Sequence, residues 1–303
     1  MKIRNYLMLL FSINTNPDLA RAIARLAHLK LGRLEIKTFA DGELYVRLKD
    51  KVRGQVVWVF GSTMPPTDNL VKLLILLNAL KTSGAKKINL IIPYFSYGRQ
   101  DHIDQPGAPL TAKLMADLIA AAGASRIVVI DLHSQKIADF FKIPAVHLNA
   151  IPLFAKYFKK IKKLVVISPD KGGEKRAATL SKLLHASTIT LSKTRPRPNV
   201  VAKIILPDGV DIQNKNIVII DDLIDTAGTI CQAAKLLKKH GAKNIYAAAA
   251  HGVFSGPAIS RIKKSPIKQV LITDTFPLPP QKKLKKIKII SVAPIISKSL
   301  RGV

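Results

Sequence analysis

Residues 217–229 read Ile-Val-Ile-Ile-Asp-Asp-Leu-Ile-Asp-Thr-Ala-Gly-Thr, the most informative segment of the chain. Its four branched apolar residues predict a buried strand, 217–220, of a parallel sheet. The strand runs into two adjacent carboxylates, Asp221 and Asp222. Open α/β sheets bind ligands beyond the carboxyl ends of their strands, and carboxylates placed there can accept hydrogen bonds from sugar hydroxyls. The strand and its acids therefore predict a ligand site.

The second half of the stretch, 225–229, predicts a turn into a helix from Thr229 to His240 that stops at Gly241. The N–H groups at a helix N-terminus point at a bound phosphate, and two threonine hydroxyls add donors. Helix capping would explain one aspartate or one threonine, but not three acids and two threonines within nine positions. The turn therefore predicts a sugar-phosphate site.

Alternating strand and helix patterns fill the rest of the chain and predict an α/β fold, with parallel sheets covered by helices on both faces. The remaining expected strands are 7–13, 56–60, 88–92, 127–130, 164–168, 188–191, 245–250 and 269–272. The remaining expected helices are 17–31, 68–83, 110–122, 173–184 and 256–263. Two comparable halves meet near residues 145–150.

Composition narrows the class of protein. A chain of 303 residues that is 48% apolar can bury two cores, and its lack of an apolar run near ~18 residues argues against a membrane span. The one cysteine, Cys231, excludes an intrachain disulfide and fits a reducing, cytoplasmic location.

The net charge of +30 would suit a nucleic-acid binder. The lysines are scattered, however, with one local concentration at 282–288. With only 6% aromatic residues, the chain also lacks interleaved stacking groups. We therefore expect a solvated lysine-rich face and no nucleic-acid partner.

Five further segments complete a recognisable set with residues 217–229. They are 39–43 (Phe-Ala-Asp-Gly-Glu), 93–101 (Pro-Tyr-Phe-Ser-Tyr-Gly-Arg-Gln-Asp), 131–134 (Asp-Leu-His-Ser), 168–173 (Ser-Pro-Asp-Lys-Gly-Gly) and 193–196 (Lys-Thr-Arg-Pro). In this order and spacing, the chain resembles the ribose-phosphate pyrophosphokinases (phosphoribosyl pyrophosphate synthetases) over nearly its whole length.

The resemblance implies two phosphoribosyltransferase-like domains, each a mainly parallel sheet flanked by helices. The first domain would comprise residues 1–147 and bind the nucleotide. The second domain would comprise residues 148–286 and contain the ribose 5-phosphate loop. The tail, residues 287–303, would pack back on the first domain. The implied reaction transfers the diphosphoryl group of ATP to O1 of ribose 5-phosphate and releases AMP, for nucleotide biosynthesis. Such chemistry needs positioning and charge stabilisation, usually with Mg²⁺. The resemblance also implies a homo-oligomer with a hexameric unit.

Catalytic cations are expected at Lys193 and Arg195, in a segment where Pro196 and Pro198 predict an irregular, mobile loop. Arginine can grip phosphate with a fork of donors, whereas lysine acts as a point charge. Without the other motifs, a solvated basic loop would be the better interpretation. The resemblance also assigns ribose 5-phosphate to Arg195, Asp221, Asp222, Asp225, Thr226, Ala227, Gly228 and Thr229.

The remaining site residues also come from the resemblance. It assigns ATP to Phe39, Asp41, Gly42, Glu43, Arg99, Gln100 and Asp101, and Mg²⁺ to His133 and Asp170. Three of these assignments have a plainer alternative: an Asp-Gly turn between two strands for 39–43, a loop histidine for His133 and a helix cap for Asp170. Imidazole is an unusual ligand for Mg²⁺, which prefers oxygen, so the role of His133 depends on the resemblance.

Two departures from the family pattern stand out. The family has a strongly basic loop where this chain has 102–108, which contains no lysine or arginine. We therefore expect activity to depend weakly on free phosphate and ADP to inhibit mainly by competing with ATP. Ala227 stands where many members have glycine, and a left-handed backbone there would cost ~1–2 kcal/mol.

Two other functions compete with this interpretation. An ordinary phosphoribosyltransferase would have one such domain and would leave 99–101 and 193–195 unexplained. A catalytically silent regulatory subunit of the same family should have lost a catalytic cation or a loop acid, but Lys193, Arg195, Asp221 and Asp225 are all present.

Overall fold

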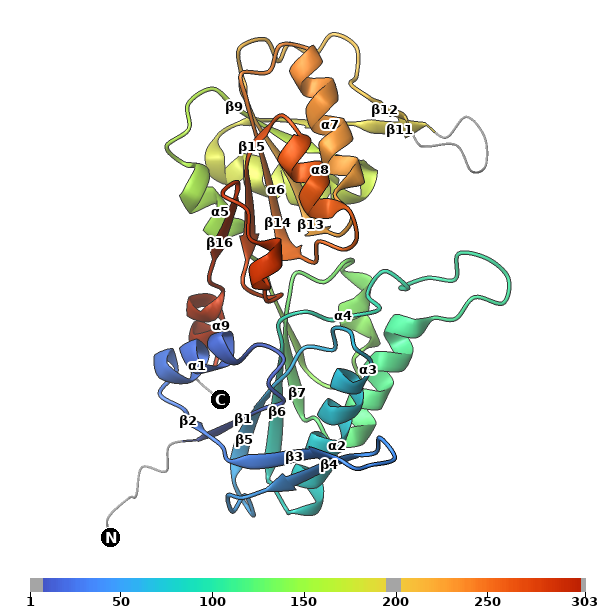
Figure 1. Ribbon diagram of the computed structural model, residues 1–303, viewed down its shortest axis with the longest axis vertical. Coiled ribbons are helices and arrows are strands. Elements are labelled where there is room, and N and C mark those ends of the chain that lie inside the picture. The colour runs from blue at the N-terminus through green and yellow to red at the C-terminus, as the bar shows by residue number, and fades with distance from the viewer. Residues whose placement is uncertain (1–7, 195–202, 301–303) are drawn as a thin grey trace. The chain divides into compact units, whose positions relative to one another are not determined.

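The computed structural model describes residues 8–194 and 203–300. The chain forms two compact units: unit 1 comprises Met1–Leu148 and Ser291–Val303, and unit 2 comprises Asn149–Ile290 (Figure 1). Among the described residues, no helix combines the length and the apolar character that crossing a membrane requires.

Unit 1 is built on a parallel sheet with the strand order β2-β1-β5-β6-β7-β8. The strands are β1 (Leu9–Ser12), β2 (Lys30–Leu31), β5 (Val56–Phe60), β6 (Lys87–Ile92), β7 (Arg126–Ile130) and β8 (Ala145–Leu148). The helices are α1 (Pro17–Leu26), α2 (Asp68–Thr82), α3 (Thr111–Ala122), α4 (Lys136–Phe140) and α9 (Ala293–Ser299). An antiparallel hairpin, β3 (Leu34–Thr38) and β4 (Leu44–Leu48), precedes β5.

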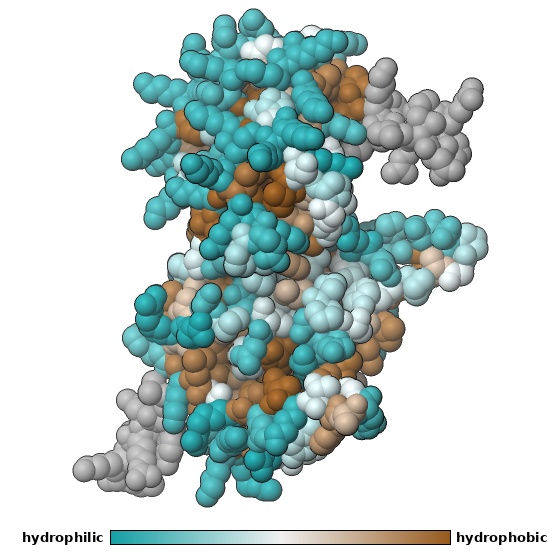
Figure 2. Space-filling view, viewed as in Figure 1, coloured by the Kyte–Doolittle hydropathy of each residue, from teal (hydrophilic) through white to brown (hydrophobic). Residues whose placement is uncertain are grey.

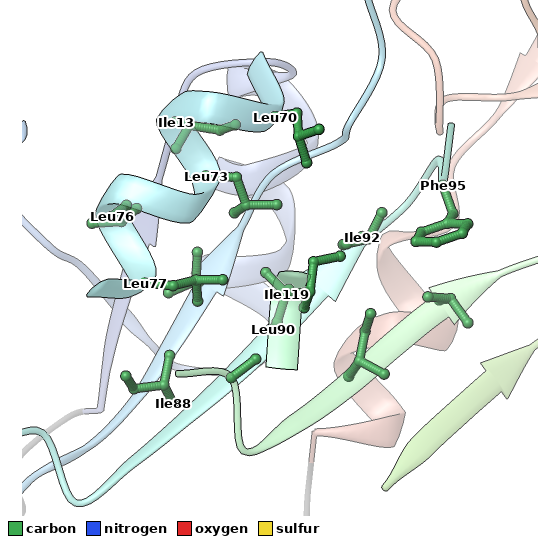
Figure 3. Close-up of a cluster of buried hydrophobic side chains, with 14 of the residues drawn as sticks. Ile13, Leu70, Leu73, Leu76, Leu77, Ile88, Leu90, Ile92, Phe95 and Ile119 are labelled. Atoms are coloured by element: carbon green, nitrogen blue, oxygen red, sulfur yellow. The ribbon is translucent and has the colours of Figure 1, made fainter. Parts of the chain in front are cut away.

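The core of unit 1 lies between its sheet and helices α2 and α3. Leucines of α2, among them Leu73 and Leu77, are fully buried against Leu90 and Ile92 of β6 and Ile119 of α3 (Figure 3). Burying one such side chain contributes roughly 1.5–3 kcal/mol. This packing fixes the strand ends from which the loops of unit 1 emerge.

Unit 2 repeats the pattern with the strand order β10-β9-β13-β14-β15-β16, again all parallel. The strands are β9 (Leu164–Ser168), β10 (Ser187–Thr190), β13 (Asn216–Ile224), β14 (Asn244–Gly252), β15 (Ile267–Thr273) and β16 (Ile287–Ile290). The helices are α5 (Ile151–Phe158), α6 (Glu174–Leu184), α7 (Gly228–Lys239) and α8 (Ala258–Lys264), with 3₁₀ turns η1 (Lys171–Gly173) and η2 (Pro280–Lys282). A hairpin, β11 (Ser192–Thr194) and β12 (Lys203–Ile205), precedes β13.

Helices cover both faces of the second sheet. One core contains Ile230 of α7 and Ile262 of α8, and the other contains Phe154 of α5 and Leu180 of α6. The strands between them are hydrophobic on both faces, as a buried parallel sheet requires. The expected fold class, parallel α/β layers flanked by helices, is confirmed.

Three expected boundaries were wrong. The helix expected over 17–31 ends at Leu26, because His28 turns left-handed (φ 55°), and Lys30–Leu31 becomes the edge strand β2. The strand expected over 217–220 continues to Ile224, so both acids lie within it. The tail expected to pack back on the first domain begins later: Ile287–Ile290 pairs with β15 in unit 2, and α9 packs against α1 in unit 1.

Candidate functional site

The carboxylate pair lies at the carboxyl end of the central strands of unit 2. Pairing of β13 with β9 ends at Ile219 and Ile167, just before the acids, whereas Asp221 still pairs with Ala249 of β14. The backbone N–H of Asp222 donates to Oδ1 of Asp221 at 2.9 Å, and the Asp222 side chain is only 6% exposed. Burial and then the neighbouring charge of Asp222 raise the pKa of Asp221 to about 8. Below that pH the pair therefore holds one proton and about one negative charge, which a ligand or a cation can offset.

The turn after β13 presents the N-terminus of α7. Ala227 is left-handed (φ 57°), the conformation with the expected cost of ~1–2 kcal/mol, and it precedes the first helical residue, Gly228. The first helical hydrogen bond joins the N–H of Cys231 to the carbonyl of Ala227 at 3.2 Å. The N–H groups before it are free of intrahelical partners, as at any helix start, and suit an anion.

Arg261 of α8 fixes this turn from the side. Its Nη1 donates to the carbonyl oxygen of Thr226 at 3.0 Å, and a Cβ added at Gly228 would meet the same nitrogen at 3.5 Å. The N–H of Ser255 donates to the carbonyl of Asp225 at 3.1 Å. The turn that would hold a phosphate therefore has a cation beside it and a defined backbone.

Asp170 lies at the same edge of unit 2, after β9. It is the cap of η1: its Oδ1 accepts from the N–H of Gly173 at 3.3 Å, and Ser168 Oγ donates to its carbonyl oxygen at 2.6 Å. A Cβ at Gly173 would come within 2.6 Å of Ser168 Oγ, so this close approach needs glycine. The structural alternative, a cap, is confirmed and is compatible with a second role.

His133 belongs to unit 1, where it follows β7 and is exposed. Within 8–194 and 203–300, no cluster of three or more histidine, cysteine, aspartate or glutamate side chains is arranged to hold a metal. The oxygens of Asp170 match the preference of Mg²⁺, whereas imidazole does not. The metal roles of both residues stay predictions.

Arg99 and Gln100 lie in a loop of unit 1 that precedes α3. They border a cavity of about 530 Å³ whose other walls come from residues 102 and 104–109. Gln100 Oε1 accepts from Thr111 Oγ1 at 2.5 Å. Burial raises the pKa of Asp101, but hydrogen bonds from its neighbours, including His102 at 2.7 Å, lower it more. The expected ATP contacts of this loop are untested predictions.

Residues 39–43 form the turn of the β3–β4 hairpin. Gly42 is left-handed (φ 94°), and Asp41 Oδ1 accepts from the N–H of Glu43 at 3.0 Å, so the Asp-Gly turn is confirmed. The ring of Phe39 is 52% exposed and lies 5.8 Å from that of Tyr45. An aromatic ring this exposed can stack on a planar ligand, and its adenine contact stays a prediction.

The prediction that both catalytic cations lie in an irregular loop was wrong for Lys193. Lys193 lies in the strand β11 and pairs with Ile204 of β12, since the two prolines come after this strand. Arg195 lies outside the described residues.

Comparison with known proteins identifies the family. Residues 8–123 match the N-terminal domain of ribose phosphate pyrophosphokinase, and 162–303 match a phosphoribosyl synthetase-associated domain. The chain is 48% identical over 295 residues to a ribose-phosphate pyrophosphokinase of Caldanaerobacter subterraneus subsp. tengcongensis, covering 96% of this chain and 93% of that one. The chain belongs to the ribose-phosphate pyrophosphokinase family.

Two further relatives in the ribose-phosphate pyrophosphokinase family support this assignment. The enzyme so named from Aquifex aeolicus is 44% identical over 294 residues, covering 95% of this chain and 93% of that one. A phosphoribosylpyrophosphate synthetase crystal structure from Mycobacterium smegmatis matches with a TM-score of 0.90 at 34% identity, covering 97% and 98% of the two chains. The resemblance inferred from the six segments is thus confirmed at the level of family and fold.

Two arginines near the site of this pyrophosphokinase family member were not predicted from the sequence. Arg261 supports the turn at Thr226, and Arg176 of α6 lies between Asp221 and Asp222. A signal for Arg176 was present: it stands in the first turn of a predicted helix, where the helix dipole disfavours a cation. Arg261 gave no such signal, because it is far from the turn in sequence.

Proposed function

We propose that this chain transfers the diphosphoryl group of ATP to O1 of ribose 5-phosphate, giving 5-phosphoribosyl 1-pyrophosphate and AMP for nucleotide biosynthesis. The main support is the edge of unit 2, where Asp221 and Asp222 lie at the end of β13 and the turn into α7 follows. A carboxylate pair beside an anion-binding helix start suits one molecule that carries both hydroxyl and phosphate groups.

The groups at this edge bind the sugar phosphate, and the two expected catalytic cations act on the transferred group. The N–H groups of the 225–229 turn, with the hydroxyls of Thr226 and Thr229, bind the 5-phosphate. Asp221 and Asp222 accept hydrogen bonds from ribose hydroxyls and orient the sugar. Lys193 and Arg195 stabilise the charge that develops on the transferred group, and Arg195 also contacts ribose 5-phosphate.

The proposed cofactor is Mg²⁺. When bound, it neutralises charge on the ATP phosphates. Asp170 is the ligand that the donor chemistry supports, and His133 is proposed only by resemblance to the family. Asp170 also holds the start of α6, since its carboxylate caps η1.

Unit 1 is the proposed nucleotide side. Phe39 would stack on adenine, Asp41, Gly42 and Glu43 would contact it, and Arg99, Gln100 and Asp101 would bind the rest of ATP. In the family the hairpin often comes from a neighbouring subunit, so we also propose a homo-oligomer with a hexameric unit.

Exposed apolar side chains support the oligomer. Ile103 is 64% exposed, Phe39 52% and Leu114 53%, and Figure 2 shows hydrophobic residues at the surface of unit 1. Where exposed apolar groups gather into a patch they can form an interaction surface, which is the role we propose for this surface of unit 1. We place the protein in the cytoplasm, because its one cysteine, Cys231, is a buried free thiol and needs no oxidising compartment.

One experiment tests the function: AMP release from ATP, measured with and without ribose 5-phosphate and with and without Mg²⁺. We expect AMP only when ATP, ribose 5-phosphate and Mg²⁺ are all present. A phosphorus resonance of a new diphosphate ester should appear with it. AMP release without the sugar phosphate would contradict the proposed acceptor. A folded protein that releases none under any condition would favour a silent regulatory subunit.

A further inference from the structure

Arg176 occupies an unfavourable position for a cation. It lies in the first turn of α6 (Glu174–Leu184), where the partial positive charge of the helix dipole repels it. Its side chain is only 15% exposed, so the guanidinium has also lost most of its hydration. Both effects disfavour an arginine here unless another group compensates for them.

The compensation comes from the carboxylate pair on β13. One guanidinium nitrogen lies 3.6 Å from Asp221 Oδ1, and the other lies 3.6 Å from Asp222 Oδ1. Both distances are too long for a hydrogen bond, so the guanidinium lies between the two acids rather than binding one of them. One positive charge then faces two adjacent carboxyl groups, and it offsets the negative charge that this pair carries.

We propose that Arg176 is the positioning residue of the sugar site: it holds Asp221 and Asp222 side by side and offsets their mutual repulsion, so that both can accept hydrogen bonds from ribose hydroxyls. This inference rests on the proposed function, which places ribose at these acids. Arg176 acts through the acids and does not itself contact the reacting atoms.

The local fold carries Arg176 to this position. Ser168 ends β9, and its hydroxyl donates to the carbonyl of Asp170, which caps η1 and starts α6. Since β9 and β13 are neighbours in the sheet, the first turn of α6 falls beside the acids of β13. The rigid turn thus sets where the guanidinium lies, and flexible lysines could not reproduce the planar fork between two carboxylates.

The first test measures coupling in the ligand-free protein. Arg176→Gln should lower Tm, because it leaves two adjacent buried acids without their cation. Asp222→Asn in the Arg176→Gln background should restore most of that loss, because it removes one of the repelling charges. If Arg176→Gln alone does not fold, recovery of folding in the double variant is the supporting result. A double variant no more stable than Arg176→Gln overturns the inference.

The second test measures function. Arg176→Gln should raise KM for ribose 5-phosphate by about 10-fold or more, with much less change for ATP. The acid limb of the kcat/KM profile for ribose 5-phosphate should move to higher pH by about one unit, because the acids lose the charge that favours their ionised forms. Arg176→Lys should recover the pH profile more than the KM, since it keeps the charge but not the fork.

Lys175→Gln is the matched control, since it removes an exposed cation from the same helix turn. It should change neither KM nor the pH profile. An unchanged KM and pH profile in folded Arg176→Gln would overturn the inference. Asp221→Asn separates this failure from that of the proposed sugar site: an unchanged KM for ribose 5-phosphate in Asp221→Asn would contradict the site itself, whatever the result at Arg176.

Discussion

The two units share one strand order but differ at equivalent loops. β5 and β13 each lie third in their sheet, in β2-β1-β5-β6-β7-β8 and β10-β9-β13-β14-β15-β16. The last part of β13 carries two acids and the open turn 225–229 follows the strand, whereas β5 is followed by Gly-Ser-Thr and then a Pro-Pro pair before α2. A shared topology therefore places two similar strand ends, and the loop residues decide what each end can bind.

The loop after β5 uses its polar groups internally. The hydroxyl of Ser62 accepts from the N–H of Tyr94 at 3.3 Å, and that of Thr63 accepts from the N–H of Ser96 at 2.8 Å. Both side chains are buried, so neither hydroxyl faces a ligand. The loop after β13 instead leaves the N-terminus of α7 open and keeps charged groups beside it. Ser62 and Thr63 thus serve the packing of unit 1 at the position where unit 2 has the turn 225–229.

A second pair of equivalent segments differs in the opposite way. Each unit inserts an antiparallel hairpin before its third strand: β3–β4 in unit 1 and β11–β12 in unit 2. The first presents the exposed ring of Phe39, and the second carries Lys193. We therefore expect the two hairpins to have different roles: β3–β4 would stack on adenine, and β11–β12 would stabilise charge on the transferred group.

The largest effect should follow loss of the hairpin cation in unit 2. We expect Lys193→Ala to lower kcat by at least ~100-fold, because it removes a charge that acts on the transferred group in the transition state. Single-turnover rates and circular dichroism would show whether chemistry or folding is affected. Lys203→Ala, on the pairing strand β12, is the control and should retain activity. A folded Lys193→Ala enzyme with near-normal kcat would remove the catalytic assignment.

Substitutions in the loops after β13 and after β5 should have smaller effects that differ in kind. Asp225→Ala should weaken ribose 5-phosphate by about 10-fold or more while ATP changes little, because Asp225 belongs to the proposed phosphate turn. Thr63→Ala, after β5, should instead cost about 1–2 kcal/mol of stability through a lost buried hydrogen bond and leave both affinities unchanged. Calorimetric titration of each ligand and thermal unfolding would measure the two outcomes. An equal loss of affinity for both ligands in Asp225→Ala would contradict the assignment of this turn to ribose 5-phosphate alone.

The sequence predicted what depends on short spacings. The strand at 217–220, the helix expected from Thr229 and the Asp-Gly turn at 41–42 are each specified by neighbouring residues. All three occur in the structure, although the strand continues to Ile224 and the helix starts at Gly228. Arg176 and Arg261 could not be predicted as partners of the β13 acids and turn, because these pairings depend on how separate elements pack. The left-handed His28, which ends α1 early, has no glycine or proline to mark it.

The carboxylate pair should also give unit 2 a measurable pH dependence. The pKa of Asp221 is raised to about 8 in the folded protein, from 3.8 in the unfolded chain. Between these values the folded state holds a proton that the unfolded state has released, so this group lowers stability as pH rises from about 4 to 8. We expect Asp221→Asn to become increasingly more stable than wild type over that window, measured by ligand-free Tm. A constant difference would contradict the raised pKa.

The smallest effect is expected at the loop of unit 1 that departs from the family. Residues 102–108 contain one histidine and one aspartate but no lysine or arginine, although they border the cavity beside Arg99. A site for inorganic phosphate or for the β-phosphate of ADP needs cations or converging N–H groups. We therefore expect activity to depend weakly on free phosphate, and ADP to inhibit by competing with ATP.

Initial rates against ATP at several fixed ADP concentrations distinguish the two modes of inhibition. Competition alone leaves the maximal rate unchanged at saturating ATP, because ATP then displaces ADP from the one site that they share. A marked fall in the maximal rate would mean that ADP binds elsewhere and that cations outside 102–108 form a regulatory site. Replacing Gln105 with lysine offers the converse test, since it returns one cation to the loop. We expect this variant to depend more strongly on phosphate than wild type, and an unchanged dependence would show that the loop does not control regulation.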